Sequence, residues 1–148
     1  MTHPPTGKFA AKHPPGEVPN SRIAKSVVAH LVSGKLSCAA ATLVAKELGV
    51  PLSEVGKTAD LMEIRVYGCL LGLFGQEELA GEKKLITTVE SVPDEMKQAI
   101  LSRSVGDAMD CLTTWQIAEE TGCGLTKIMS YCEKLGIKIT RCQLGAFQ

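Results

Sequence analysis

An internal repeat restricts the fold of this chain more than any other feature of its sequence. Shifting the sequence on itself so that Cys38 falls on Cys111 aligns positions 38–75 with positions 111–148 without a gap, and ten of the aligned pairs are identical. The same shift aligns two upstream apolar stripes at helical spacing, Ile23, Val27, Val28 and Val32 with Met96, Ile100, Leu101 and Val105. The chain is therefore expected to fold as two copies of one small unit, residues 20–75 and 93–148.

Each copy has the pattern of three helices followed by a short strand. In the first copy, apolar spacing and glycines predict helices over about residues 21–32, 37–48 and 53–62, and a β-run over residues 64–67. In the second copy, the first helix is expected to begin at Asp94 and the β-run covers residues 137–140. The expected fold class is mostly α with short β-strands, that is, α+β.

The segments outside these elements set the expected domain boundaries. Residues 1–20 are rich in proline and poor in apolar side chains, which predicts a flexible tail. Residues 76–92 begin with glycine and charged residues and lead into Leu85–Val89, which together with residues 64–67 predicts a β-hairpin, or wing. The expected domains are a tail (1–20), a first unit with its wing (21–92) and a second unit (93–148).

The second and third helices of each copy carry a recognisable motif. A small residue lies where the helices would cross (Ala45 or Ala118), and a glycine lies at the turn (Gly49 or Gly122). Glycine adopts the positive φ that reverses the chain within a few residues. This pattern resembles the helix-turn-helix motif. With the β-run and the wing, each unit resembles a winged-helix domain, which implies tandem duplicated winged-helix-like units.

The resemblance implies double-stranded DNA as a partner and a role in transcription regulation. In winged-helix proteins the third helix enters the major groove, while the wing and helix N-termini contact phosphates. The outward faces of the third helices also carry Asp60 and Glu133 and lack Arg, Asn and Gln, which departs from a base-reading helix. The alternative for the nearby basic side chains is that they are solvated surface charges. The residues matched to DNA contact are Ser53, Lys57, Arg65, Lys83, Lys84, Thr126, Lys127, Ser130, Lys138 and Arg141.

Charge and hydropathy limit the possible partners. The 16 basic and 16 acidic residues cancel, so no net field draws the protein to nucleic acid or to an anionic membrane. Residues 21–75 carry six basic and four acidic groups, whereas residues 93–148 carry six and seven, so the first unit suits nucleic acid better. No apolar run approaches the roughly 20 residues of a membrane span, and no secretory signal is visible. We expect a cytoplasmic protein without a membrane partner.

The repeat divides the six cysteines into two kinds. Cys123 and Cys132 align with Val50 and Ala59, so they are expected to be small buried hydrophobic residues. The other four are duplicated, and the two of each copy lie far apart in the chain with no C-x-x-C chelate, which argues against a zinc ribbon or c-type haem. These four are either ancestral core residues or, if the fold gathers them, a thiol or metal site. They are Cys38, Cys69, Cys111 and Cys142.

Catalytic motifs are weak. The expected folded region contains one histidine, His30, and neither Gly34-Lys35 nor Gly122-Cys123-Gly124 has the context of a phosphate-binding loop. We therefore expect no enzymatic activity and no cofactor. Trp115 is expected to contact the other unit.

Three functions remain open at this level. The duplicated helix-turn-helix pattern favours a DNA-binding regulator. The neutral charge and the strand at residues 137–140, which needs the linker strand or a second chain as partner, favour an assembly module that forms a homodimer. The duplicated cysteines favour a metal-cluster or thiol-switch protein. The first is the preferred hypothesis.

Overall fold

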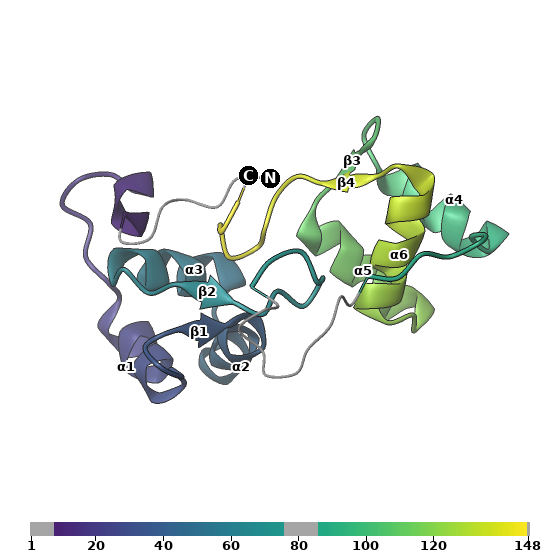
Figure 1. The fold of residues 1–148 in the computed structure, drawn as a ribbon. Coiled ribbons are helices and arrows are strands. Elements are labelled where there is room, and N and C mark those ends of the chain that lie inside the picture. Colours follow the sequence, from purple (N-terminus) through teal and green to yellow (C-terminus); the bar gives the residue numbers. More distant parts are fainter. Residues whose placement is uncertain (1–7, 76–85, 148) are drawn as a thin grey trace.

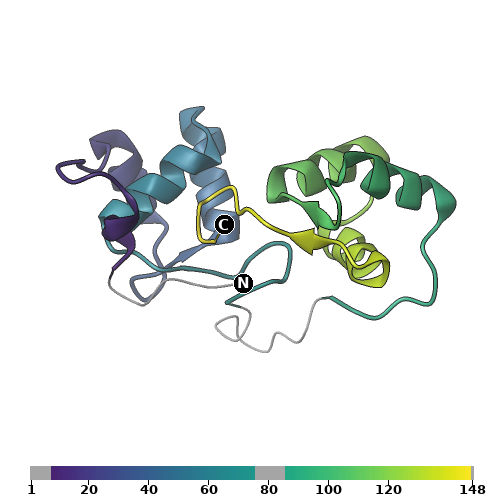
Figure 2. The same ribbon diagram turned by 90° about the horizontal axis from the view of Figure 1, so that it is seen from above.

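The computed structural model describes residues 8–75 and 86–147, and its helices form two groups that lie side by side (Figures 1 and 2). A short 3-10 helix, η1 (Phe9–Lys12), precedes them. The first group contains α1 (Ser21–Ala29), β1 (Leu36–Ser37), α2 (Cys38–Leu48), α3 (Leu52–Leu61) and β2 (Val66–Tyr67). The second contains α4 (Asp94–Arg103), β3 (Ala108–Met109), α5 (Cys111–Thr121), α6 (Leu125–Leu135) and β4 (Lys138–Ile139). The molecule is therefore mostly helical with short strands, as expected.

Local signals place the central helices of both repeats in the same way. Ser37 caps the start of α2 and Asp110 caps the start of α5, because each side chain accepts a hydrogen bond from an amide of the first helical turn. Both helices end at a glycine in the left-handed conformation, Gly49 with φ of 66° and Gly122 with φ of 72°. Within the described residues, no helix combines the length and the apolar character that a membrane crossing needs.

The strands pair differently from the expectation. β1 pairs in parallel with β2, and β3 pairs in parallel with β4, so in each repeat two helices connect two parallel strands. The sequence did not predict β1 and β3, because each has only two residues and the alternation of apolar and polar residues cannot be recognised over that length. Residues 86–89, predicted to form the second strand of a wing, contain no strand, and residues 76–85 lie outside the described part. The wing is therefore absent from the described residues.

After its last strand, each repeat sends a turn into the other repeat. The turn after β2 buries Leu71 in the core of the second repeat, and the turn after β4 buries Leu144 in the core of the first. These equivalent leucines are only 1% and 4% exposed. Figure 1 shows the second crossing, in which the C-terminal segment leaves β4 and runs back toward α3. Each hydrophobic core is thus completed by a side chain of the other repeat.

The two crossing turns have the same conformation and meet each other. Gly72 and Gly145 have φ of 79° and 76°, and each donates its N–H to the carbonyl three residues earlier, at 2.9 and 3.0 Å. Phe74 and Phe147 pack edge to face with their ring centroids 6.0 Å apart. The repeated Cys-x-Leu-Gly-x-Phe sequence therefore encodes a turn that fills the neighbouring repeat.

Residues 8–20 lie against the first repeat and correct the expectation of a flexible tail for this part. Phe9 is 3% exposed, and its backbone amide donates to the Glu63 carboxylate at 2.9 Å. His13 lies 2.8 Å from the Asp60 carboxylate of α3. The proline-rich composition predicted disorder because ordering such a segment costs entropy. The burial of the Phe9 ring and the contacts with the carboxylates of Glu63 and Asp60 offset that cost.

The crossing over α3 is tested by replacing Gly56. A Cβ atom at this position would lie 2.0 Å from the carbonyl oxygen of Leu144, so Gly56→Ala forces the C-terminal segment away from α3. We expect the free energy of unfolding in urea to fall by about 1–3 kcal/mol, whereas the control Ser53→Ala on the exposed side of α3 has little effect. Without this contact, alanine would stabilise the helix by roughly 0.5–1 kcal/mol. A more stable variant would therefore contradict the crossing.

Candidate functional site

The outer face of α3, predicted to read DNA, is largely covered. Ser53 is exposed, but Lys57 is half-buried and its Nζ lies 2.5 Å from a carboxylate oxygen of Glu17. Gly56 is buried beneath the C-terminal segment, and Asp60 is buried beneath the N-terminal segment. The sequence placed Asp60 outward because its cover, around His13, lies far away in the chain.

The outer face of α6 is covered in part. Lys127 is exposed, with its Nζ 5.7 Å from the ring centroid of Tyr131, and Thr126 is half-buried. Ser130, predicted to face DNA, is 2% exposed, and its hydroxyl accepts a hydrogen bond from the Thr87 amide at 3.1 Å. The prediction for Ser130 is wrong because the segment between the repeats packs over this part of α6.

The remaining predicted DNA contacts are scattered. Arg65 is half-buried, whereas Lys138 and Arg141 are exposed. Lys83 and Lys84 lie outside the described residues.

One open cleft brings three of the predicted DNA contacts together. It measures about 730 Å³ and is lined by Ser53, Lys57 and Arg141, together with residues of the N-terminal and C-terminal segments. Carboxylates line the same cleft, namely Glu54, Asp60 and Asp110. The cleft is therefore mixed in charge and is not a basic groove for phosphates.

The duplicated cysteines come together because of the strand register. The register joins Leu36 to Val66 in the first repeat and Ala108 to Lys138 in the second. Cys38 and Cys69 follow the two strands of the first pair, and so they lie next to each other where these parallel strands end. In the second repeat, the Cys111 amide donates to the carbonyl of Arg141, which immediately precedes Cys142, at 2.9 Å. The two cysteines of each repeat are thus far apart in the chain because they follow two different strands, and the pairing of these strands brings them together.

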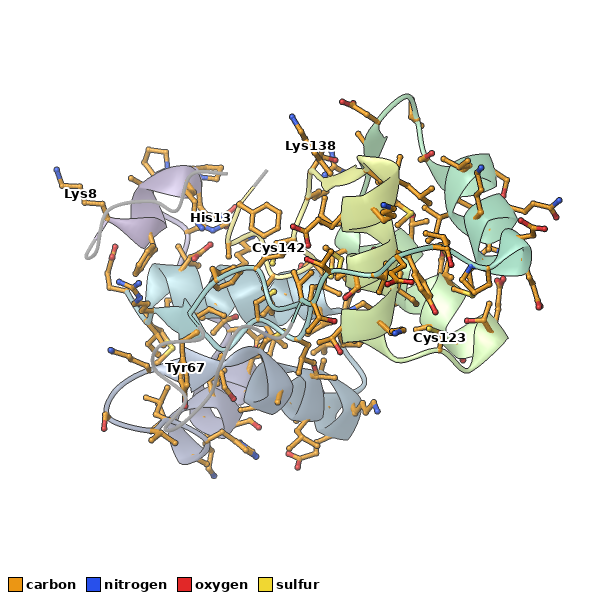
Figure 3. The ribbon with its side chains drawn as sticks, turned by 45° about the vertical axis from the view of Figure 1, so that its right-hand side comes forward. Lys8, His13, Tyr67, Cys123, Lys138 and Cys142 are labelled. Atoms are coloured by element: carbon orange, nitrogen blue, oxygen red, sulfur yellow. The ribbon has the colours of Figure 1, made fainter. Side chains whose placement is uncertain are left out.

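The crossing turns bring both cysteine pairs to one cavity between the repeats. Cys38 and Cys69 of the first repeat line it together with Cys111 and Cys142 of the second. Figure 3 shows Cys142 between the two groups of helices. Gln143 also lines the cavity. The rest of the lining consists of apolar side chains and one indole, from Leu52, Leu70, Leu71, Phe74, Trp115, Leu144 and Phe147.

The cavity is small and partly open to solvent. The void among the side chains is about 10 Å³, the size of one water molecule. The wider hollow, including its opening to solvent, measures about 360 Å³. As the described side chains stand, no three His, Cys, Asp or Glu residues form a group that could hold a metal ion. The four thiols thus surround the hollow without converging on one point.

Burial and hydrogen bonding act in opposite directions on these thiols. Burial raises the pKa of Cys38 to about 12 and the pKa of Cys111 to about 11, and it also raises the pKa of Cys69. The side-chain amide of Gln143 donates to Cys111 Sγ at 3.5 Å and lowers the pKa of that thiol, and the nearby backbone of Leu70, the equivalent residue, lowers the pKa of Cys38. Burial therefore dominates, and these thiols are protonated at neutral pH.

The four thiols also act on one another. Cys69, Cys142 and Cys111 each raise the pKa of Cys38, so each thiolate that forms makes the next one less favourable. A bound cation has the opposite effect, because it stabilises all the thiolates at once. The four thiols are therefore coupled, and each ionises less readily when another has already lost its proton.

Trp115 also lines the cavity. The cavity is lined by Trp115 and by residues of both repeats, which agrees with the predicted contact of Trp115 with the other unit. Its indole N–H is buried and has no hydrogen-bond acceptor among the described residues. An unpaired buried donor costs about 1–3 kcal/mol. The equivalent residue of the first repeat is Thr42, so only the second repeat supplies this donor.

Comparison with known proteins adds no assignment to this geometry, since no family model, curated protein or solved structure matches the chain. The cysteine site therefore rests on the residues and the fold alone. Sequence reasoning identified its four thiols through their duplication. It missed Gln143, whose side-chain amide donates to Cys111 Sγ, because the two residues lie 32 positions apart in the chain.

The two unduplicated cysteines differ in burial, which gives a test of the packing. Cys132 is fully buried as predicted, whereas Cys123 is half-buried and so corrects the expectation for that residue. Burial raises the pKa of Cys132 to about 11, which leaves roughly a hundredfold less thiolate at neutral pH than its ordinary value of 9.0.

We expect iodoacetamide at neutral pH to modify Cys123 in the folded protein and to leave Cys132 unmodified, as measured by peptide mass spectrometry. The rate at Cys132 rises with pH because its thiolate fraction rises. In urea both residues react, which serves as the control. Equal rates in the folded protein would contradict the buried position of Cys132.

Proposed function

We propose that the protein binds a metal centre through the thiolates of Cys38, Cys69, Cys111 and Cys142, and that this centre joins its two repeats. One observation carries the proposal: the four duplicated cysteines, two from each repeat, line a single cavity. Four thiolates are the ligand set of zinc and of iron–sulfur centres. Cys123 and Cys132, which are not duplicated, are not among the residues that line this cavity.

The surroundings of the thiols support metal binding. The apolar wall lowers the local dielectric constant, which strengthens the attraction between thiolates and a cation. The side-chain amide of Gln143, 3.5 Å from Cys111 Sγ, stabilises the thiolate form of that residue. Because the thiols must lose protons to become ligands, metal uptake releases protons and weakens as the pH falls.

A metal bound at this position would also hold the two repeats together. Cys69 and Cys142 begin the crossing turns, and Cys38 and Cys111 begin α2 and α5. A metal bound to all four would fasten each turn to the helix starts of both repeats. The free energy of metal binding therefore adds to the stability of the paired repeats.

The proposal predicts that metal content depends on the duplicated cysteines alone. After anaerobic purification, replacing any one of the four with serine is expected to lower the bound metal at least about tenfold. Replacing a residue that only hydrogen-bonds to a metal ligand already lowers metal affinity about 10–100-fold. Elemental mass spectrometry measures the metal per chain. The matched controls Cys123→Ser and Cys132→Ala retain it, since Ala59 is the natural counterpart of Cys132. Wild-type protein without a transition metal would refute the proposal.

A second candidate function is binding of double-stranded DNA by the second repeat. α5 and α6 meet at Gly122 as a helix-turn-helix motif would, and Lys127 and Lys138 are exposed. We propose that these lysines contact phosphates and not bases, because Ser130 on the outer face of α6 is buried. With equal numbers of acidic and basic residues, such binding depends strongly on salt.

The DNA proposal is tested by fluorescence anisotropy with a mixed-sequence duplex at several salt concentrations. Lys127→Glu and Lys138→Glu are expected to weaken binding to all sequences alike and to reduce the salt slope by about 1 each. Lys25→Glu on α1 of the other repeat is the control and retains wild-type affinity. No binding tighter than about 10⁻⁴ M at low salt would reject this function.

A further inference from the structure

We infer that the protein associates head to tail with further copies of itself, through the outer face of α1 in one molecule and the outer face of α4 in the next. The residues that line the cysteine cavity belong to neither face, so the inference goes beyond the proposed metal site. It follows from the exposure of equivalent apolar side chains, from a difference in charge between the two faces, and from the positions of the two helices.

Equivalent apolar side chains are exposed at the first helix of each repeat. Val28 on α1 and Leu101 on α4 occupy the same position of the repeat, and both are exposed. Four residues later, Val32 and Val105 are 62% and 84% exposed. These side chains contribute little to the core of their own repeat. Both copies of the unit therefore present the same pair of apolar side chains on their surface.

The backbone fixes the position of the two valines. Val32 exchanges two backbone hydrogen bonds with Lys35, at 2.9 and 3.0 Å, and Val105 exchanges two with Ala108, at 2.8 and 3.1 Å. Each valine therefore lies at the base of a tight turn whose backbone is already ordered. Burying these side chains against a partner thus costs little additional conformational entropy.

The outer face of α1 is basic. Arg22, Lys25 and Val28 follow one another at intervals of three residues, and all three are exposed. Residues three apart in a helix lie next to each other on its surface. The sequence of α1 contains no acidic residue. Together with Val32, these residues form a basic and partly apolar surface, which we call the α1 face.

The equivalent surface of α4 is acidic at its start. Glu95 and Gln98 replace the arginine and the lysine, and with Leu101 and Val105 they form the exposed α4 face. A shallow hollow of about 740 Å³ lies on this face and is lined by Glu95, Lys97, Gln98, Ala99, Leu101 and Ser102. Asp94 and Glu95 outweigh the one lysine of the hollow. The α4 face therefore suits the basic and apolar side chains of an α1 face.

The positions of the two helices identify a second copy of the chain as the partner. α1 and α4 lie at opposite ends of the molecule (Figures 1 and 2). Each molecule thus carries both complementary faces, and it can bind one copy at each end. Contacts between two different surfaces of one chain build rings or filaments. Pairing of two α1 faces would instead bring like charges together.

The inference is tested by exchanging the residues of the two faces in the full-length protein. Arg22→Glu with Lys25→Gln gives α1 the polar residues of α4, so both faces of this first variant are of the α4 type. Glu95→Arg with Gln98→Lys makes both faces of a second variant of the α1 type. Each new residue comes from the equivalent helix, so both variants are expected to fold, as circular dichroism checks.

Sedimentation velocity measures the association. We expect the wild-type protein to form assemblies whose size grows with protein concentration and decreases with salt. Each variant alone is expected to have a dissociation constant at least about tenfold higher, whereas an equimolar mixture of the two variants assembles again. The control Lys138→Glu with Arg141→Gln changes the net charge as the first variant does and retains the association. Wild-type protein that stays monomeric at every concentration, or variants that each associate alone as the wild type does, would overturn the inference.

A further variant tests the apolar part of the contact. Val105→Ser removes a side chain that is 84% exposed, so the free energy of unfolding in urea is expected to stay unchanged. We expect the dissociation constant of the assembly to rise about tenfold, because the apolar surface of this valine is no longer buried between molecules. An unchanged dissociation constant would contradict the place of this turn in the interface.

Discussion

The exchange of two turns between the repeats is the contact on which the rest of the structure depends. Leu71 and Leu144 each fill the core of the other repeat, and burying a leucine contributes about 1.5–3 kcal/mol. A repeat of this size is only marginally stable, so a gap in its core would be costly. The same exchange carries Cys69 and Cys142 to the boundary between the repeats. The crossing turns therefore both complete the two hydrophobic cores and position the cysteines of the proposed metal site.

Duplication explains why a thiol site can exist without a local chelating motif. One repeat contributes two thiols, which are distant in the chain and are brought together by a parallel strand pair. Two thiols of this kind make half of a tetrathiolate site. A second copy, joined through the crossing turns and the contact between Phe74 and Phe147, supplies the other half. The proposed metal site thus requires both repeats in one chain.

The sequence predicts what depends on local pattern and misses what depends on distant segments. Helix spacing and turn glycines placed the helices of both repeats within a few residues of their bounds. The sequence missed β1 and β3, whereas β2 and β4 lie inside the predicted β-runs at residues 64–67 and 137–140. It missed the packing of the N-terminal segment because Phe9 and His13 contact Glu63 and Asp60, which lie far away in the sequence. The buried position of Ser130 was missed for the same reason, since its cover, around Thr87, lies far away in the sequence. The four cysteines were singled out by duplication, but only the register and the crossing show that they share a cavity.

X-ray absorption spectroscopy at the edge of the bound metal tests the central claim most directly. If both repeats supply their thiols to one centre, the atoms bound to the metal are all sulfur, at about 2.3 Å. Cys142→Ser and Cys69→Ser, which change different repeats, are then both expected to lose most of the bound metal. A metal with nitrogen or oxygen ligands, or a spectrum that is unchanged when either cysteine is replaced, would contradict the account.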